Sequence, residues 1–357
     1  MPPIQKTQQL FSKNLAYVLF NFIAIVFIAI LGKKILCPLV FALLFSLVLL
    51  PIARFLEKKL HFRRALSSAV AVVLLEAFLI AIVYFIAAQL GGVTQDWPHF
   101  KQQLTTTLTS LENGISSSLH IDTGKQQQYI DNAISKVSSY GAAFAGETLM
   151  SASTMLLFFV LLSFYLFFVL YYRALLMTFF MQAFMKKAGG TILEIAGRVQ
   201  QMIRKYVTGL LLEMIIVGTV CSLGFSLMGI KYALFLGPLT GILNVIPYVG
   251  IFSSLGITLL ITIASAGAAK AAAVAGFVVA VHLTDSNILL PFIVGGRVKI
   301  NGLVTLMGVV AGELIWGIAG MFLSIPILAV AKIIVDHIDH LKHWGTLLGN
   351  ERPGKKP

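Results

Sequence analysis

Four acidic side chains and one histidine lie inside long apolar stretches of this sequence, where ionisable residues are uncommon. They are Glu76, Glu213, His282, Asp285 and Glu313. If these stretches span a lipid bilayer, each charge at its centre costs at least about 2.5–3.5 kcal/mol and needs a partner, a water-filled cavity or a bound proton. His282 and Asp285 are three residues apart, so they share one face of a helix and can exchange a proton. The five residues are candidates for the path of a proton or cation, or for hydrogen bonds that hold a helical bundle together.

Three further polar side chains occur beside proline residues in the same stretches. Asn244 and Tyr248 flank Pro247, and Asn287 precedes Pro291. These groups can offer hydrogen bonds to a small polar solute, or to backbone carbonyls that a proline leaves unpaired. Packing or anchoring at the membrane interface explains them equally well.

Two apolar runs, at about 232–264 and 302–335, exceed the roughly 20 residues that a spanning helix needs. In hydrocarbon, carbonyls freed by a helix break must be paired by protein or face a water-lined cavity. Each run is therefore a kinked span, a re-entrant hairpin or part of a substrate path. The hinge candidates in them are Gly237, Pro238, Gly241, Pro247, Tyr248, Gly250, Gly312, Gly317, Gly320 and Pro326.

The composition identifies a polytopic membrane protein. Hydrophobic residues make up 58% of the 357 and charged residues 11%, against about 25% charged in soluble domains. The 27 Lys+Arg exceed the 14 Asp+Glu, but the basic residues cluster in loops between apolar runs, as the positive-inside bias requires. No basic and aromatic motif indicates nucleic-acid binding. Cys37 and Cys221 lie in apolar runs without metal-ligand spacing, so neither a disulfide framework nor a metal site is expected.

Counting each apolar run once predicts an all-α transmembrane bundle of about eight spans, with broken helices in the C-terminal half. The predicted parts are residues 1–90 with spans one to three, 91–147 as an extracytoplasmic helical hairpin, 148–340 as the C-terminal transmembrane domain, and 341–357 as a polar cytoplasmic tail. Within the third part, a basic amphipathic helix at about 185–206 is expected on the cytoplasmic side.

Charge and periodicity predict the orientation of these parts. Residues 54–64 contain five Lys/Arg and one Glu, which is typical of a cytoplasmic loop and places both termini in the cytoplasm. Residues 91–147 then lie outside. Their apolar positions recur every three or four residues, the pattern of amphipathic helices.

The sequence contains none of the motifs that would indicate a common enzyme class. His-Glu-x-x-His, Gly-x-Ser-x-Gly and Gly-x-x-x-x-Gly-Lys-Ser/Thr are all missing from it. We therefore expect no enzymatic activity and no cofactor. Without a nucleotide site, any transport is expected to run downhill or on an ion gradient.

The C-terminal half resembles the autoinducer-2 exporter family, permease-type proteins of the bacterial inner membrane. Three blocks carry the resemblance: Gly237-Pro238 to Ile246-Pro247-Tyr248-Val249-Gly250; Asp285-Ser286-Asn287-Ile288-Leu289-Leu290-Pro291 with Val294-Gly295-Gly296; and Ala311-Gly312, Trp316-Gly317-Ile318-Ala319-Gly320 and Ser324-Ile325-Pro326-Ile327. Matching hydropathy extends over about residues 10–340. Ile251 departs from the family, which frequently has proline there.

The resemblance implies a bundle of seven or eight helices, an extracytoplasmic insertion after the third, and a homo-oligomer. It also implies export of a small polar solute similar to autoinducer-2, or exchange of Na⁺ for H⁺. An alternative from another class is a non-transporting oligomeric scaffold that acts through the extracytoplasmic hairpin and the basic cytoplasmic surface. In that case the acids only pair within the bundle.

Overall fold

The chain is helical throughout the part described by the computed structural model. The described residues are 3–96, 98, 100, 102–103, 106, 153–246, 249–289, 292, 300–338 and 342–349. Within them, the structure outside helices consists of turns and one isolated antiparallel bridge between Ile300 and Gly349. The expected all-α fold is confirmed. Most of the expected hairpin 91–147 lies outside the described residues, as do the hinge candidates Pro247 and Tyr248.

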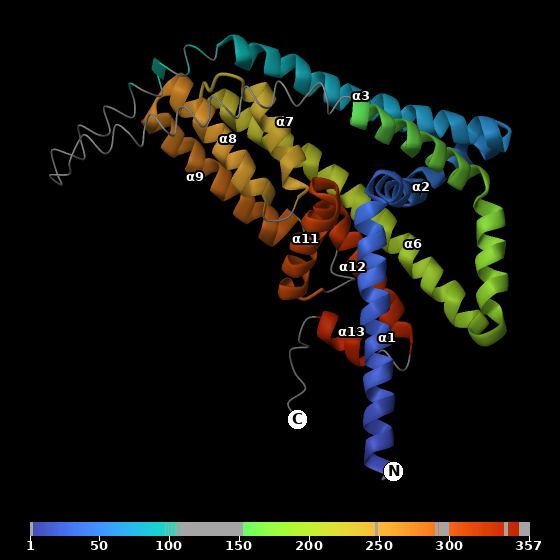
Figure 1. Cartoon of the computed structure of the whole chain (residues 1–357). Helices are drawn as coiled ribbons and strands as arrows, with labels where there is room; N and C mark the ends of the chain where they lie inside the picture. The colour runs from blue at the N-terminus through green and yellow to red at the C-terminus, as the bar shows by residue number, and fades with distance from the viewer. Residues whose placement is uncertain are drawn as a thin grey trace. The chain divides into compact units, whose positions relative to one another are not determined.

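Figure 1 shows the described helices, coloured from blue at the N-terminus to red at the C-terminus. They are α1 (Pro3–Leu31), α2 (Lys33–Lys59), α3 (Arg64–Gln95), an unlabelled helix Ser153–Tyr171, α6 (Arg173–Leu227), α7 (Ala233–Asn244), α8 (Val249–Ala266), α9 (Ala268–Thr284), the π-helical turn η1 (Asp285–Leu289), α11 (Gly302–Trp316), α12 (Ile318–His337) and α13 (Lys342–Leu348).

Seven of the described helices contain segments long and apolar enough to cross a membrane. Many large apolar side chains on them face outward; Phe252, for example, is 74% exposed. In water such a surface would be a liability, whereas in a bilayer it contacts lipid tails at no hydrophobic cost. The chain is therefore a multi-pass membrane protein.

Each of the two long broken runs forms a pair of packed helices. The first run divides into α7 and α8, and the second into α11 and α12. At a rise of 1.5 Å per residue, the 12 residues of α7 extend only about 18 Å, less than the roughly 30 Å hydrocarbon core. The question left open by the sequence is thus answered in favour of helix pairs over single kinked spans.

Helix α6 differs from the sequence expectation. A basic amphipathic helix at about 185–206 was expected, but one 55-residue helix extends beyond that range at both ends. No proline occurs between Arg173 and Leu227, so no residue there lacks the backbone N–H that continues a helix. A helix of this length measures about 80 Å, far more than the bilayer needs.

The chain divides into two compact units. One comprises Met1–Ser46, Val160–Ile195 and Ile300–Pro357, and the other Leu47–Phe159 and Ala196–Lys299. In the second unit α7, α8 and α9 lie side by side (Figure 1). Its core is formed by buried apolar residues of α6 to α9, among them Val217, Cys221, Phe225, Phe235, Leu236, Ile261, Val274 and Val278.

In the first unit, α11 and α12 form an antiparallel hairpin. Gly317 makes the turn at φ 68°, a conformation that L-residues rarely adopt. Gly312 and Gly320 bring the two backbones into contact, and a methyl group on either would overlap the other's carbonyl. The Trp316 indole Nε1–H donates to the carbonyl of Ala29 on α1 at 2.9 Å.

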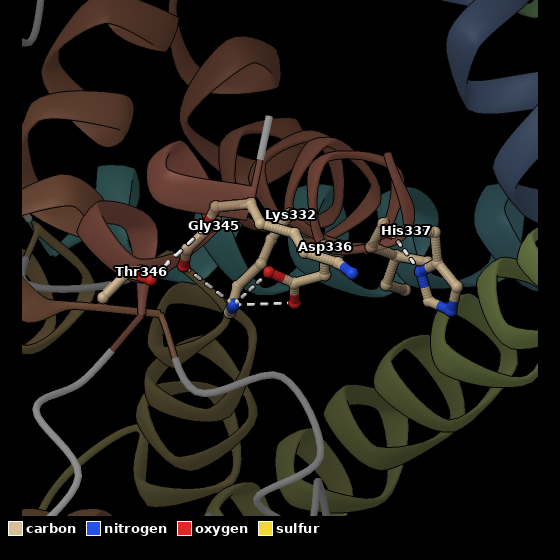
Figure 2. Close-up of polar contacts among 7 residues, drawn as sticks. Lys332, Asp336, His337, Gly345 and Thr346 are labelled. Atoms are coloured by element: carbon tan, nitrogen blue, oxygen red, sulfur yellow. Dashed lines mark hydrogen bonds and ion pairs between the residues drawn. The ribbon is translucent and has the colours of Figure 1, made fainter. Parts of the chain in front are cut away.

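The helix α13 closes the open end of this hairpin. Figure 2 shows the Lys332 ammonium between the Asp336 carboxylate and the Gly345 carbonyl, with Nζ–O distances of 2.8 Å and 3.1 Å. The Leu348 carbonyl accepts a hydrogen bond from the backbone N–H of Asn301, just before α11, at 2.9 Å. The segment after α12 therefore contacts both the start of α11 and the last turns of α12, which together form the open end of the hairpin.

Candidate functional site

The buried face of α6 contains one acid among apolar residues. Side chains three or four positions apart along this helix are buried: Tyr206, Leu210, Glu213, Val217, Cys221 and Phe225. Such spacing puts them on a single stripe. The periodicity that buries the apolar residues therefore buries Glu213, whose exposed fraction is 4%.

A tight turn returns the chain from α6 into α7. Gly229 has φ 65°; its N–H donates to the Ser226 carbonyl, and the Ile230 N–H donates to the Phe225 carbonyl. This is the Schellman arrangement that ends helices at a glycine. Tyr232 then starts α7 in the left-handed region, at φ 65°, which is unusual for a bulky residue.

Glycines bring the backbones of α6 and α7 into contact. A methyl group on Gly237 would overlap the Ser222 backbone, and one on Gly241 would overlap the Met214 carbonyl and the Gly218 backbone. At Gly218, a methyl group would lie 3.3 Å from the Pro238 Cα atom. The pairing runs antiparallel, so the last residue of α7, Asn244, falls beside Glu213.

Asn244 connects two buried acids from different helices. Its Nδ2 donates to Glu213 Oε1 at 2.9 Å and to Asp285 Oδ2 at 2.8 Å. Asp285 follows α9 directly and is 5% exposed. An amide nitrogen has two N–H groups, so Asn244 uses both. Three residues that the sequence marked separately thus form one cluster, here called the acid–amide cluster.

The second oxygen of each acid is left open. Glu213 Oε2 and Asp285 Oδ1 are buried and have no hydrogen-bond partner in the described part of the chain. Among the same residues, no lysine, arginine or histidine forms an ion pair with either acid. Two neighbouring negative charges in an apolar interior are strongly unfavourable. A proton or small cation shared between them would remove the repulsion, and this is chemistry that the cluster can perform.

A local change of helix type accompanies Asp285. Residues Asp285–Leu289 form the π-helical turn η1, and such turns are frequent at functional sites. Asn287 is exposed there, and its Nδ2 donates to the Leu283 carbonyl of the preceding turn at 2.7 Å. Its amide is therefore engaged with its own backbone.

The other ionisable candidates lie on α9, α3 and α11. His282 Nε2 lies 3.4 Å from the Ser286 hydroxyl, and its Nδ1 has no hydrogen-bond partner among the described residues. Glu76 is half-buried on α3, and Glu313 is exposed on α11, in the other compact unit. Their sequence-based roles in an ion path remain predictions.

The hinge candidates fall into two groups. Gly237, Pro238 and Gly241 on α7 and Gly250 at the start of α8 belong to one unit; a methyl group on Gly250 would overlap the Leu243 carbonyl at the end of α7. The other hinge candidates in the described residues, Gly312, Gly317, Gly320 and Pro326, belong to the α11–α12 hairpin. Close backbone packing is what the structure shows for most of them.

An apolar cavity of about 390 Å³ adjoins the α6–α7 contact. It is lined by Phe78, Ala81, Ile82, Phe85, Met214, Ile215, Gly218, Thr219, Ser222, Pro238 and Ile242. The hydroxyls of Thr219 and Ser222 both donate to carbonyls of their own helix at 2.7 Å. The cavity therefore suits hydrocarbon better than a polar solute.

Three polar residues that the sequence did not single out meet at the opposite end of α7. Lys231 Nζ and the Tyr232 hydroxyl both bind the Asp96 carboxylate. The Tyr232 hydroxyl also lies 3.0 Å from the Gly92 carbonyl. No local pattern indicates this meeting, because Asp96 follows α3 and the other two residues are more than 130 positions later.

Comparison with known proteins gives one family. The family model described as "AI-2E family transporter" matches residues 18–340. YueF of Bacillus subtilis is 27% identical over 328 residues, 85% of this chain and 84% of that protein. YhhT of Escherichia coli K12 is 25% identical over 326 residues, 90% of each chain. YrrI of Bacillus subtilis is 37% identical over 133 residues, which is 37% of each chain. All three bear provisional names as transport proteins.

Proposed function

Because this chain belongs to the AI-2E transporter family, we propose that it is an ion-coupled secondary transporter in which the acid–amide cluster binds the coupling ion. The family gives the general role, which is membrane transport. The cluster supplies the more specific argument, which is made from geometry and charge.

The observation that carries this proposal is the bridge from one amide to two buried acids. A purely structural hydrogen-bond network in a membrane protein would pair its acids with bases or leave them protonated and fully bonded. Here Glu213 Oε2 and Asp285 Oδ1 remain open, and the amide adds no charge. The pair is therefore suited to hold one positive charge that can be released again.

The three helices of the cluster define how binding would be coupled to movement. Glu213 comes from α6, Asn244 from the end of the short helix α7, and Asp285 from the start of η1. Without a bound cation, repulsion between the carboxylates favours their separation. With it, the two carboxylates attract the cation and hold the helices together. Binding of a cation to the cluster would thereby shift the equilibrium between two arrangements of these helices, as alternating access requires.

We further propose a location in the bacterial inner membrane with both termini in the cytoplasm. The basic residues at the end of α2 and the start of α3 support this orientation. The transported species would be a small polar solute similar to autoinducer-2, which is exported in exchange for the coupling ion. Alternatively, the protein would exchange Na⁺ for H⁺.

Flux in proteoliposomes tests the proposal. The native protein is compared with Glu213→Gln and Asp285→Asn, using an internal pH-sensitive dye and an imposed gradient of either pH or Na⁺. We expect both substitutions to reduce gradient-driven flux by at least about tenfold, because one open oxygen and one negative charge of the cluster disappear. A dye response to Na⁺ at equal pH distinguishes Na⁺/H⁺ exchange from proton-coupled export of a solute.

Thr284→Val provides a matched control beside Asp285. Thr284 is exposed and its hydroxyl donates only to the Ala280 carbonyl, so this variant should transport as the native protein does. Glu313→Gln is measured as well, because loss of flux there would extend the path to α11. Native flux in both Glu213→Gln and Asp285→Asn would refute a coupling role for the cluster.

A further inference from the structure

The end of α7 remote from Asn244 is held by a polar contact of three residues, which we call the α7 clasp: Asp96, Lys231 and Tyr232. Lys231 Nζ and the Tyr232 hydroxyl approach the same carboxylate oxygen, Asp96 Oδ2. Lys231 Nζ also lies 5.3 Å from the centre of the Tyr232 ring. The Asp96 side chain is 26% exposed and that of Lys231 is 54% exposed, so the clasp lies where one side is open to solvent.

Apolar contacts fix the Tyr232 ring behind this carboxylate. The ring meets Phe100 edge-on, with centroids 6.2 Å apart, and Phe100 belongs to the buried core of this unit. On its other side the ring covers Gly92 of α3, where a methyl group would lie 3.2 Å from Tyr232 Cε1. The clasp therefore joins the end of α3 to the first turn of α7.

Helix α7 is a short rod with a polar link at each end. Its 12 residues separate the clasp from Asn244 by about 18 Å. Between these ends, Gly237 and Gly241 touch the backbone of α6 directly. No side chains intervene there to absorb a displacement, so a shift at one end of the rod is transmitted to the other.

We infer that Asp96 and Tyr232 are positioning residues that hold α7 in the register in which Asn244 bridges Glu213 and Asp285. Opening of the clasp would let α7 withdraw Asn244, and the two acids would lose their common donor. Asp96 lies near the start of the extracytoplasmic segment 91–147 expected from the sequence, so the clasp also offers a route by which that segment influences the ion site. The effect that this inference predicts on transport rests on the proposed function. The effect that it predicts on amide hydrogen exchange of α7 does not.

The Lys231 ammonium and the Tyr232 hydroxyl are both protonated at neutral pH, because the pKa of each group is raised. The hydrogen bond to Asp96 raises the pKa of Lys231 above its ordinary value of 10.5. Partial burial, together with the hydrogen bond to Asp96, raises the pKa of Tyr232 above 10.0. Both raised values mean that the stabilising protonated forms are fully present below about pH 10 and are lost only as pH rises beyond it. Measurements at pH 6–9 therefore examine a fully formed clasp.

Amide hydrogen exchange of the purified full-length protein tests the inference. The variants are Tyr232→Phe, which removes one hydroxyl, and Asp96→Asn, which removes the shared charge. We expect peptides covering 233–246 to exchange about fivefold faster, as for loss of one hydrogen bond, while peptides covering 268–284 stay unchanged. The double variant should add little, because both substitutions open one contact. Tyr84→Phe, at a 74% exposed tyrosine on α3, is the matched control and should leave the exchange rates of both groups of peptides unchanged.

Transport provides the second readout. The half-saturating ion concentration should rise about fivefold in Tyr232→Phe and Asp96→Asn, and Asp96→Glu should restore it in part. Unchanged exchange of 233–246 in both variants would overturn the clasp, and so would faster exchange with an unaltered half-saturating concentration. If native flux is not ion-coupled at all, the proposed function fails, and the exchange rates still decide whether the clasp holds α7.

Discussion

At the scale of single residues, Asn244 has a different role from the one its neighbours in the sequence suggest. An asparagine beside a break in an apolar run is a reasonable ligand for a polar solute. In the structure, both N–H groups of its amide are already engaged, with Glu213 at 2.9 Å and with Asp285 at 2.8 Å. Under the proposed function, its contribution is to fix the two acids at a set separation.

Asn244→Asp should destabilise the protein in a pH-dependent manner. An ionised aspartate cannot donate, so two hydrogen bonds to carboxylates, worth about 1.5–3 kcal/mol each, are lost and a third negative charge is added. Protonation supplies an O–H donor and removes charge. We expect Tm in detergent to fall by at least about 5 °C at pH 8, with much of the loss recovered at pH 5.

Differential scanning fluorimetry of native and variant protein across this pH range makes the comparison. The native protein supplies the baseline at every pH. An equal Tm deficit at pH 5 and pH 8 would contradict the charge argument and would mean that Asn244 matters through packing alone.

At the scale of elements, both broken runs use glycine to bring helix backbones together. Gly237 and Gly241 do so between α7 and α6, and Gly312 and Gly320 between α11 and α12. In lipid there is no hydrophobic gain from pressing two apolar helices together, so close van der Waals contact has to supply the attraction. These glycines are thus required for packing, and through α7 they also set the position of Asn244.

Gly241→Ala should separate α7 from α6. The new methyl group has only backbone atoms of Met214 and Gly218 to displace, and such overpacking typically costs 1–3 kcal/mol, so roughly that loss is expected. Gly256→Ala on α8 is the control, because nothing lies within 4 Å of its added methyl group and alanine favours helix by about 0.5–1 kcal/mol. Tm and flux of the two variants are compared, and equal behaviour would contradict the packing argument.

At the scale of the whole molecule, the exposed apolar helices and the family assignment agree on a multi-pass membrane protein. The distribution of charge further predicts its orientation. The end of α2, the start of α3 and the connection between them carry Lys58, Lys59, Arg63 and Arg64, and basic segments are retained in the cytoplasm.

Reporter fusions test this orientation. A fluorescent protein that matures only in the cytoplasm should be bright at both termini, and alkaline phosphatase should be active only when inserted within 107–145. Active phosphatase at either terminus would contradict the predicted topology. The 107–145 insertion also shows whether that segment is accessible to a partner, as the scaffold alternative requires.

The sequence by itself determined the fold class, the positions of most spans and the family, because hydropathy and short motifs are local properties that add along a chain. It also marked Glu213, Asn244 and Asp285, but only as members of a longer set of candidates that included Glu76, His282 and Glu313. Only the tertiary structure decided that the first three meet across separations of 31 and 41 residues. Their meeting depends on which helix faces touch, and the Gly-x-x-x-Gly spacing of Gly237 and Gly241 does not say which helix they contact. The clasp at Asp96 and the docking of α13 were beyond sequence reasoning for the same reason, since each joins groups that are close in space through packing between helices.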